Sequence, residues 1–296
     1  MIENRTVGTR LFQLVIGLVL TALCISWIYP LWHVFAVSIS GPSAVQRNAV
    51  NILPLDIDFR MYQIILSLPQ VQRGYLNTVL YAAGGTLIAL VSNSFYAYPL
   101  SKPDLPGRRF FVIYLAITMF FSGGLIPTWL VIRSLGMLNT YLVMVLPAAV
   151  GAWTVIVMRT FFQSLPYSYT ESAMIDGASE IQILARIIVP LSKPLYATMG
   201  LFTIVGIWNS WFNALIYLDD PRRWPIQMTL REITIRNVIP QSAGMQQYME
   251  AMGRGAPIPL NYQYTMLMVV IIPILIMYPF LQKYFVKGVM VGSIKG

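Results

Sequence analysis

The sequence predicts an all-α, polytopic membrane protein. Of its 296 residues, 57% are hydrophobic and only 10% are charged, a composition too apolar for a soluble domain of this size. Six stretches are long enough to hold about 20 apolar residues each, the length that a helix needs to cross hydrocarbon. We therefore expect one domain, residues 1–296, with six transmembrane helices and a cytoplasmic helix-turn-helix between the fourth and fifth.

The first apolar stretch, residues 11–37, follows Arg5 and Arg10 and has the flanks of a secretory signal peptide. Its apolar core is too long for one, and we find no convincing small-residue cleavage site, so we interpret it as a retained first span. The other predicted spans are residues 75–100, 110–132, 136–160, 194–218 and 260–282.

Basic residues in the short connections predict the orientation. The connection after the second span carries three bases and one acid, namely Lys102, Arg108, Arg109 and Asp104. The next connection carries only Arg133. Because short cytoplasmic loops are rich in Lys and Arg, the former connection and both termini should lie in the cytoplasm. The net charge of +9 then reflects loops that face anionic membrane lipid, not a nucleic-acid partner.

Two longer segments face outward in this topology. Residues 38–73 include a possible short surface helix near residues 59–68. Residues 219–254 form a polar insertion between the fifth and sixth spans. Loops of this length are usually functional or disordered.

The long cytoplasmic connection, residues 164–194, predicts a helix, a turn and a second helix. Both helix starts have the spacing of a capping box, in which a serine and a Glu or Gln three residues later satisfy each other's backbone N–H groups: Ser168 with Glu171, and Ser179 with Gln182. The intervening Asp176 and Gly177 predict the turn. Pro166 and Pro190 should bound the pair, because a proline inside a helix removes a hydrogen bond.

Each of these two helices has an apolar side flanked by acids. The apolar positions are Ala173, Met174, Ile175, Ile181, Leu184 and Ile188, and the acids are Glu171, Asp176 and Glu180. An apolar helix face with charged edges suits docking into a groove of a partner. The alternative is a solvated amphipathic connector that rests on the membrane surface.

The run Glu171-Ser-Ala-Met-Ile-Asp-Gly-Ala178, followed by Ile188-Val-Pro190, resembles the EAA loop of permease subunits in bacterial ATP-binding-cassette (ABC) importers. In that family the loop is the coupling helix, which docks into a cleft of the ATPase subunit. The resemblance implies this role for Glu171, Ser172, Ala173, Asp176, Gly177 and Pro190. Ser172 stands where the family usually has alanine.

Further motifs narrow the resemblance. Residues 208–212 and 292–296 are similar to the smaller permease subunit of maltose-type carbohydrate importers, and residues 118–127 are similar to the branch that handles larger or modified oligosaccharides. The resemblance implies a location in the bacterial inner membrane and a tail, Lys295 and Gly296, that contacts the ATPases. It also implies a second homologous permease, two ATPase subunits that hold ATP and Mg, an external substrate-binding protein and an oligosaccharide substrate.

The chain itself lacks the residues that power transport. It has no Gly-Lys pair and hence no phosphate-binding P-loop. No acid falls within the six predicted spans, whereas ion-driven carriers commonly need intramembrane carboxylates. The lone Cys24 and His33 do not suggest a metal site. We therefore expect neither an enzyme nor a bound cofactor; the alternatives are an ion-coupled sugar carrier that acts alone and a membrane scaffold.

The fifth span is rich in polar and aromatic residues that could line a substrate pathway: Trp208, Asn209, Trp211, Phe212, Asn213 and Tyr217. Aromatic rings stack on sugar rings, and amides bond sugar hydroxyls. On a continuous helix Trp208 and Trp211 would share one face with Phe212. A helix-packing seam or an interfacial aromatic belt is the alternative. Asn77 and Asn93 in the second span are expected to form interhelical hydrogen bonds.

The outward-facing bases are all arginine, and the 219–254 loop carries Arg222, Arg223, Arg231, Arg236 and Arg254. Arginine binds carboxylates in a bidentate manner, so an acidic, uronate-type oligosaccharide is a candidate cargo. Lipid phosphate or an acidic face of a docking protein would account for the arginines equally well. The family resemblance implies that this loop reaches the external binding protein.

Overall fold

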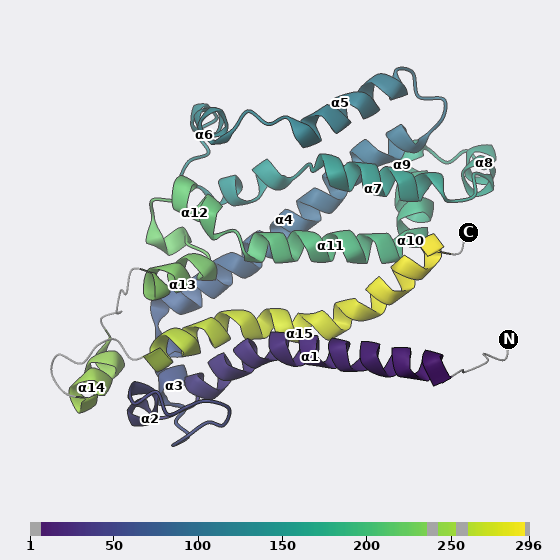
Figure 1. The fold of residues 1–296 in the computed structure, drawn as a ribbon. Coiled ribbons are helices and arrows are strands. Elements are labelled where there is room, and N and C mark those ends of the chain that lie inside the picture. The colour runs from purple at the N-terminus through teal and green to yellow at the C-terminus, as the bar shows by residue number, and fades with distance from the viewer. Residues whose placement is uncertain (1–6, 236–241, 253–259, 294–296) are drawn as a thin grey trace. The chain divides into compact units, whose positions relative to one another are not determined.

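The computed structural model describes residues 7–235, 242–252 and 260–293. All regular structure in these ranges is helical, as predicted (Figure 1). Lys295, Gly296, Arg236 and Arg254, which the sequence analysis singled out, lie outside the described residues. The chain divides into two compact units, one within residues 1–68 and 232–272 and the other within residues 69–231 and 273–296.

The first unit contains the N-terminal helix and part of the C-terminal helix. Its elements are α1 (Val7–Ser38), α2 (Pro42–Gln46), α3 (Arg60–Ser67), α14 (Ala243–Met252) and the first part of α15 (Leu260–Ser293). The helix expected near residues 59–68 is confirmed as α3. Thr265 joins α15 to the end of α1, because its hydroxyl donates to the Ser38 carbonyl at 3.0 Å.

The second unit is built on one long helix, α4 (Pro69–Ser101), against which α7 and α11 pack. Its other elements are α5 (Arg108–Phe120), α6 (Leu125–Ser134), η1 (Tyr141–Met144), η2 (Leu146–Ala148), α7 (Ala152–Gln163), α8 (Ser168–Ile175), α9 (Glu180–Ile183), η3 (Leu184–Ile188), α10 (Val189–Leu191), α11 (Lys193–Trp208), α12 (Trp211–Tyr217), η4 (Pro221–Arg223), the first turns of α13 (Ile226–Thr234) and the part of α15 from Pro273 on.

Several predicted spans are not single straight helices. Among the described residues, three helices are long and apolar enough to cross a membrane, namely Leu11–Ser38, Pro69–Ser101 and Leu260–Pro279. Three bent helix pairs would raise the number to six, if each pair forms one span. Six crossings therefore remain a prediction, whereas several apolar helices in an all-α chain are observed.

The predicted third span, residues 110–132, bends by 114° between α5 and α6. The break falls at Ser122, Gly123 and Gly124, inside the motif that resembles the oligosaccharide branch. Gly124 has φ +83° and ψ 179°, a conformation that is essentially confined to glycine. The motif thus marks a bend, which a hydropathy pattern does not reveal.

The predicted fourth span is also interrupted, by a 49° bend between η2 and α7. The Asn93 amide of α4 spans this break, since its Nδ2 donates to the Ala149 carbonyl at 3.1 Å and its Oδ1 accepts from the Gly151 N–H at 3.0 Å. The side chain therefore replaces bonds that a continuous helix would make internally, which lets irregular backbone persist inside a membrane protein. The interhelical hydrogen bonding predicted for Asn93 is confirmed.

Asn77 bonds to a different kind of segment. Its Nδ2 donates to the carbonyls of Arg222, in η4, and Trp224, at 2.9 and 3.0 Å. Next to it, the Thr78 hydroxyl accepts from the Ile226 N–H at 2.8 Å. The chain between α12 and α13 is consequently attached to the first turns of α4.

Candidate functional site

Two groups of predicted site residues lie toward opposite ends of α4 in the second unit (Figure 1). We call residues 168–191, from α8 through α10, the helix pair. We call residues 208–217, from the end of α11 through α12, the aromatic break. The two groups differ in how they are built and in what they expose.

The start of α8 differs from the prediction. Tyr167 occupies the N-cap position with helical φ −65° and ψ −24°, and no side chain caps the helix. Ser168 is already the first helical residue, so the capping box predicted for Ser168 and Glu171 is wrong. An N-cap normally has extended backbone, and that geometry is missing here. The Tyr167 carbonyl instead accepts the N–H groups of Thr170 and Glu171 at 2.9 and 3.1 Å.

The turn of the helix pair forms as the sequence predicts. Gly177 has φ +80°, and its N–H donates to the Met174 carbonyl at 3.0 Å, while the Ala178 N–H donates to the Ala173 carbonyl at 2.9 Å. Such paired bonds around a left-handed glycine end a helix in a Schellman motif. No atom lies within 4 Å of the Cβ that another residue would place at Gly177. The turn is therefore open on its outer side.

The second helix starts with the capping box that the sequence predicts, and Pro190 does not end it. The Ser179 N–H donates to the Gln182 side-chain oxygen at 2.8 Å, and the Gln182 N–H donates to the Ser179 hydroxyl at 3.4 Å. A helical run then continues to Leu191 and includes a π-helical turn, η3. Pro190 lies in the last turn of this run, directly after the π-helical turn. The chain bends by 85° two residues beyond Pro190, around Ser192.

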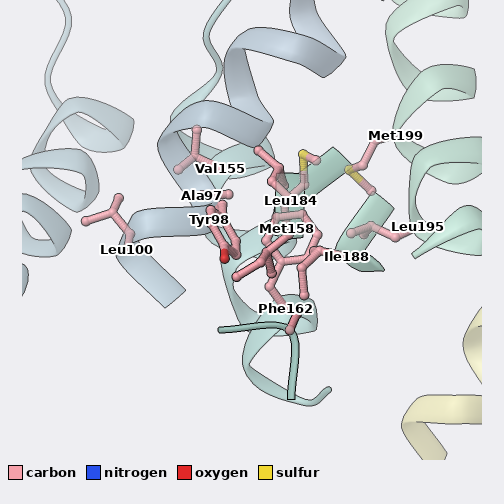
Figure 2. Packing of buried hydrophobic residues seen from close by; sticks show 12 residues of the cluster. Ala97, Tyr98, Leu100, Val155, Met158, Phe162, Leu184, Ile188, Leu195 and Met199 are labelled. Carbon is pink, nitrogen blue, oxygen red and sulfur yellow. The ribbon is translucent and has the colours of Figure 1, made fainter. Parts of the chain in front are cut away.

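The apolar residues of the helix pair fall into an inner and an outer set. Ala173, Leu184 and Ile188 are buried in a cluster with residues of α4, α7 and α11 (Figure 2). Ala173 therefore lies in the core of the unit, and the apolar side predicted for the first helix is divided between core and surface. Met174, Ile175 and Ile181 are exposed, and Ile175 is 86% exposed. Exposed with them are Glu171, Ser172, Asp176, Gly177 and Pro190.

A polar contact that the sequence analysis missed joins the helix pair to α4. The Tyr98 hydroxyl donates to Glu180 Oε2 at 2.8 Å, and Lys102 forms an ion pair with Glu180 Oε1. The Lys102 ammonium also lies 5.0 Å from the centre of the Tyr98 ring. Burial alone would raise the pKa of Glu180, but the hydrogen bonds from Lys102 and Tyr98 hold it below its ordinary value. No local pattern could reveal this contact, since its partners lie about 80 positions apart.

The aromatic break interrupts the predicted fifth span. Asn209 and Ser210 separate α11 from α12. The Asn209 side chain donates to the Val205 carbonyl at 3.0 Å, and the Ser210 hydroxyl donates to the Ile207 carbonyl at 2.6 Å. Such bonds from side chain to backbone compete with the regular helical pattern. Trp208 and Trp211 therefore do not share one helix face, contrary to the prediction.

The candidate pathway residues divide into buried and exposed groups. Trp208 and Tyr217 are buried, at 5% and 6% exposure, and the Trp208 ring lies 6.3 Å from that of Tyr75. The Trp208 and Tyr217 side chains thus pack inside the unit, as expected from the alternative of a helix-packing seam. Trp211 and Phe212 are 39% and 45% exposed. Their rings contact each other edge to face, with 5.6 Å between the ring centres. Asn209 and Asn213 are exposed as well.

Two residues of α13 contact the aromatic break. The Gln227 side chain donates to Asn209 Oδ1 at 2.9 Å, and the Arg231 guanidinium lies 5.3 Å from the centre of the Trp211 ring. Arg231 was predicted as a site residue, whereas Gln227 was missed. The result is a local group of two amides, one guanidinium and two exposed rings. These groups can bond hydroxyls, pair with a carboxylate and stack on a sugar ring.

Two other arginines of the predicted set, Arg222 and Arg223, contact residues outside the aromatic break. Arg222 forms an ion pair with Asp220 at 3.0 Å, and hydrogen bonds from Arg222 lower the pKa of that carboxyl. Arg223 lies 6.0 Å from the Tyr141 ring. The structure thus brings Arg231, and not Arg222 or Arg223, into contact with the predicted pathway residues. In the part of the chain that the structure describes, no group of three His, Cys, Asp or Glu side chains could hold a metal ion.

An all-α membrane chain with an exposed helix-turn-helix and a broken, aromatic membrane helix has the features of a transport permease. The chain belongs to the family of binding-protein-dependent transport system inner membrane components, whose model matches residues 84–291. This match includes both the helix pair and the aromatic break. The family assignment suggested by the EAA-type loop is confirmed, as is a place in the inner membrane, and the family is one of transport, not enzymatic, proteins.

Individual relatives agree with the family assignment. The chain is 38% identical, over 97% of its length and 99% of the relative's, to the polygalacturonan/rhamnogalacturonan transport system permease protein YtcP of Bacillus subtilis. It is 36% identical to protein LplC of the same organism, over 99% and 98% of the two chains. A chain from the crystal structure of a bacterial ABC transporter involved in the import of the acidic polysaccharide alginate matches with a TM-score of 0.88 and 32% identity, over 95% and 98% of the two chains.

Proposed function

We propose that this chain is one of two permease subunits of an ATP-driven importer for acidic oligosaccharides. The observation that carries the coupling part is the exposed surface of the helix pair, where Ile175 and Ile181 are exposed beside Glu171 and Asp176 around the open Gly177 turn. Exposed apolar patches rimmed by polar residues mark protein interaction sites. The EAA-type sequence of this surface supports an ATPase subunit as that partner.

In this proposal the chain works without catalytic chemistry of its own. Two ATPase subunits hold ATP and Mg, a second homologous permease completes the pathway, and an external binding protein delivers the sugar. Both termini lie in the cytoplasm. The three bases of the connection after the second span, Lys102, Arg108 and Arg109, support this orientation, because short cytoplasmic loops are rich in Lys and Arg. Closure of the ATPases moves the helix pair, and the pathway beside the aromatic break changes its open side by alternating access.

The acidic nature of the cargo is supported by two independent observations. Within the chain, Arg231 lies over Trp211, beside the Asn209 and Gln227 amides. Among the relatives, one carries a polygalacturonan/rhamnogalacturonan transport name and another comes from an importer of alginate. A guanidinium beside an aromatic ring suits a uronate, because the carboxylate can pair with the former while the sugar ring stacks on the latter.

Copurification followed by a transport assay tests both parts. The tagged chain, solubilised gently from its native membrane, should recover a second permease and an ATPase in about a one-to-one-to-two ratio. Recovery of the chain alone, in a detergent that preserves known complexes, would favour the ion-coupled carrier. With the complex in proteoliposomes, short oligogalacturonates should drive uptake and ATP hydrolysis, whereas their methyl-esterified, neutral forms should not. Equal use of both forms would contradict the acidic cargo.

A further inference from the structure

Glu180 occupies a special position in the helix pair. It is the first residue of α9, directly after the turn and the Ser179 cap. Its Oε2 bonds to Tyr98 in the last turn of α4, and its Oε1 bonds to Lys102, which directly follows α4. Two other ion pairs in the described residues, Asp58 with Arg60 and Asp220 with Arg222, join residues only two positions apart. The Glu180 pair instead connects two separate elements of the unit.

The energetics of this contact argue against a mainly stabilising role. The Glu180 side chain is 56% exposed and that of Lys102 is 20% exposed, and exposed ion pairs contribute only about 0–1 kcal/mol. The apolar cluster around Leu184 and Ile188 already attaches the second helix to α4 and α7. Interdigitated apolar side chains hold the second helix on this cluster, and the polar contact adds a second, directional attachment at the start of α9. The polar contact therefore restrains rotation of the helix pair about the cluster.

The far end of α4 connects to the other site. Asn77 and Thr78, in its first turns, bond to the segment that leads into α13, and α13 carries Gln227 and Arg231 to the aromatic break. The 33-residue α4 therefore has polar contacts to the helix pair at one end and, at the other, to the segment that leads into α13; near this end its Tyr75 ring also lies 6.3 Å from the Trp208 ring of the aromatic break. A rigid helix of this kind is a physical route between them.

We propose that Glu180, Lys102 and Tyr98 form a coupling latch, which transmits movement of the helix pair to α4. This inference rests on the proposed function, because it takes the helix pair as the ATPase contact. The latch residues are positioning residues that do not touch the ATPase or the sugar. When the latch is intact, a displaced helix pair carries α4 with it. When it is broken, the pair can pivot on its apolar cluster, and ATP is hydrolysed without transport.

The test measures oligogalacturonate uptake and ATP hydrolysis by the complete importer in proteoliposomes. Glu180→Gln and Lys102→Met should each lower the amount of sugar taken up per ATP by at least about fivefold, the lower end of ordinary coupling energies. ATP hydrolysis itself should stay near the wild-type rate. Tyr98→Phe, which removes one hydroxyl from the contact, should have a smaller effect in the same direction.

Two kinds of control distinguish the latch from a general effect of charge in this part of the chain. Asp104→Asn and Arg109→Met remove an acid and a base from the same connection outside the latch, and should leave the ratio unchanged. The exchanged pair Lys102→Glu with Glu180→Lys should regain most of the lost coupling, because the ion pair is restored. Failure of this exchange to recover coupling, or a wild-type ratio in Glu180→Gln, would overturn the latch.

Further outcomes distinguish failure of the latch from failure of the proposed function. Loss of the ATPase subunit from the purified Glu180→Gln complex would make Glu180 a docking residue and also overturn the latch. If a bulky residue at Gly177 abolishes uptake while both Glu180→Gln and Lys102→Met stay coupled, then the helix pair couples but the latch does not exist. If the bulky residue at Gly177 is harmless too, the proposed function itself is wrong.

Discussion

The helix pair and the aromatic break expose opposite chemistry toward the two ends of the same helix, α4. The helix pair exposes aliphatic side chains, Ile175 and Ile181, beside carboxylates. The aromatic break exposes the rings of Trp211 and Phe212, with a guanidinium over the first. An aliphatic, acidic surface suits a protein groove, whereas rings with a guanidinium suit an anionic sugar. The two regions therefore suit different kinds of partner, a protein groove at the helix pair and an anionic sugar at the aromatic break.

The two regions also differ in how they are held. Bonds between near neighbours, such as those around Gly177 and between Ser179 and Gln182, shape the turn of the helix pair. The aromatic break has local bonds too, from Asn209 and Ser210 to carbonyls of α11, but its exposed groups also contact α13, through Gln227 and Arg231. Substitutions should therefore affect motor contacts in the first region and cargo selectivity in the second.

The largest expected effect is at Gly177. Gly177→Leu should reduce uptake by more than about tenfold while the chain still inserts, because strain at positive φ costs only about 1–2 kcal/mol and the position has open space around it. Gly136→Leu is the matched control, since Gly136 also has positive φ and no neighbour within 4 Å. Uptake in proteoliposomes and the amount of chain in the membrane are the measurements. Equal loss of uptake in both variants would attribute it to backbone strain.

The next largest effect is expected at Arg231, beside the aromatic break. Arg231→Gln should raise the KM for oligogalacturonate about tenfold and leave ATP affinity unchanged, because a charge-assisted bond contributes about 1.5–3 kcal/mol. Arg222→Gln makes the same chemical change at a guanidinium that binds Asp220 and is not the one over the Trp211 ring, so its KM should stay near wild type. A similar rise in both variants would indicate a diffuse electrostatic effect.

A smaller effect is expected at Ile175. Ile175→Ser should leave the stability of the subunit unchanged within about 0.5 kcal/mol, since the side chain is 86% exposed. Its affinity for the ATPase should fall about fivefold, because a contact surface is lost. Titration of purified ATPase onto the permeases in nanodiscs measures this affinity. Ile52→Ser, at a residue 61% exposed in the other unit, is the control and should bind normally.

The smallest effect compares the two predicted caps. Ser179→Ala should cost about 1 kcal/mol of stability, the usual value of an N-cap. Ser168→Ala should cost almost nothing, because the Ser168 side chain does not cap α8. Thermal unfolding of the purified complexes, followed by tryptophan fluorescence, should show a lower midpoint only for Ser179→Ala. A larger shift for Ser168→Ala would contradict the observed start of α8.

Local patterns were sufficient for much of this protein. The helical membrane class follows from composition, the family follows from the run Glu171–Ala178, and the turn follows from a glycine whose backbone few other residues can adopt. These features depend on hydropathy, backbone stereochemistry and bonds between near neighbours. All three are properties of a short stretch of chain, so they can be recognised before the fold is known.

Tertiary structure decided which of these residues face outward and which distant residues join them. The same apolar pattern placed Ala173 in the core and Ile175 at the surface, because neighbouring helices cover only one side of the helix pair. It also decided that Asn209 meets Gln227 and that Glu180 meets Lys102. Such contacts require two segments to be brought together by packing, and no periodicity within either segment encodes the other.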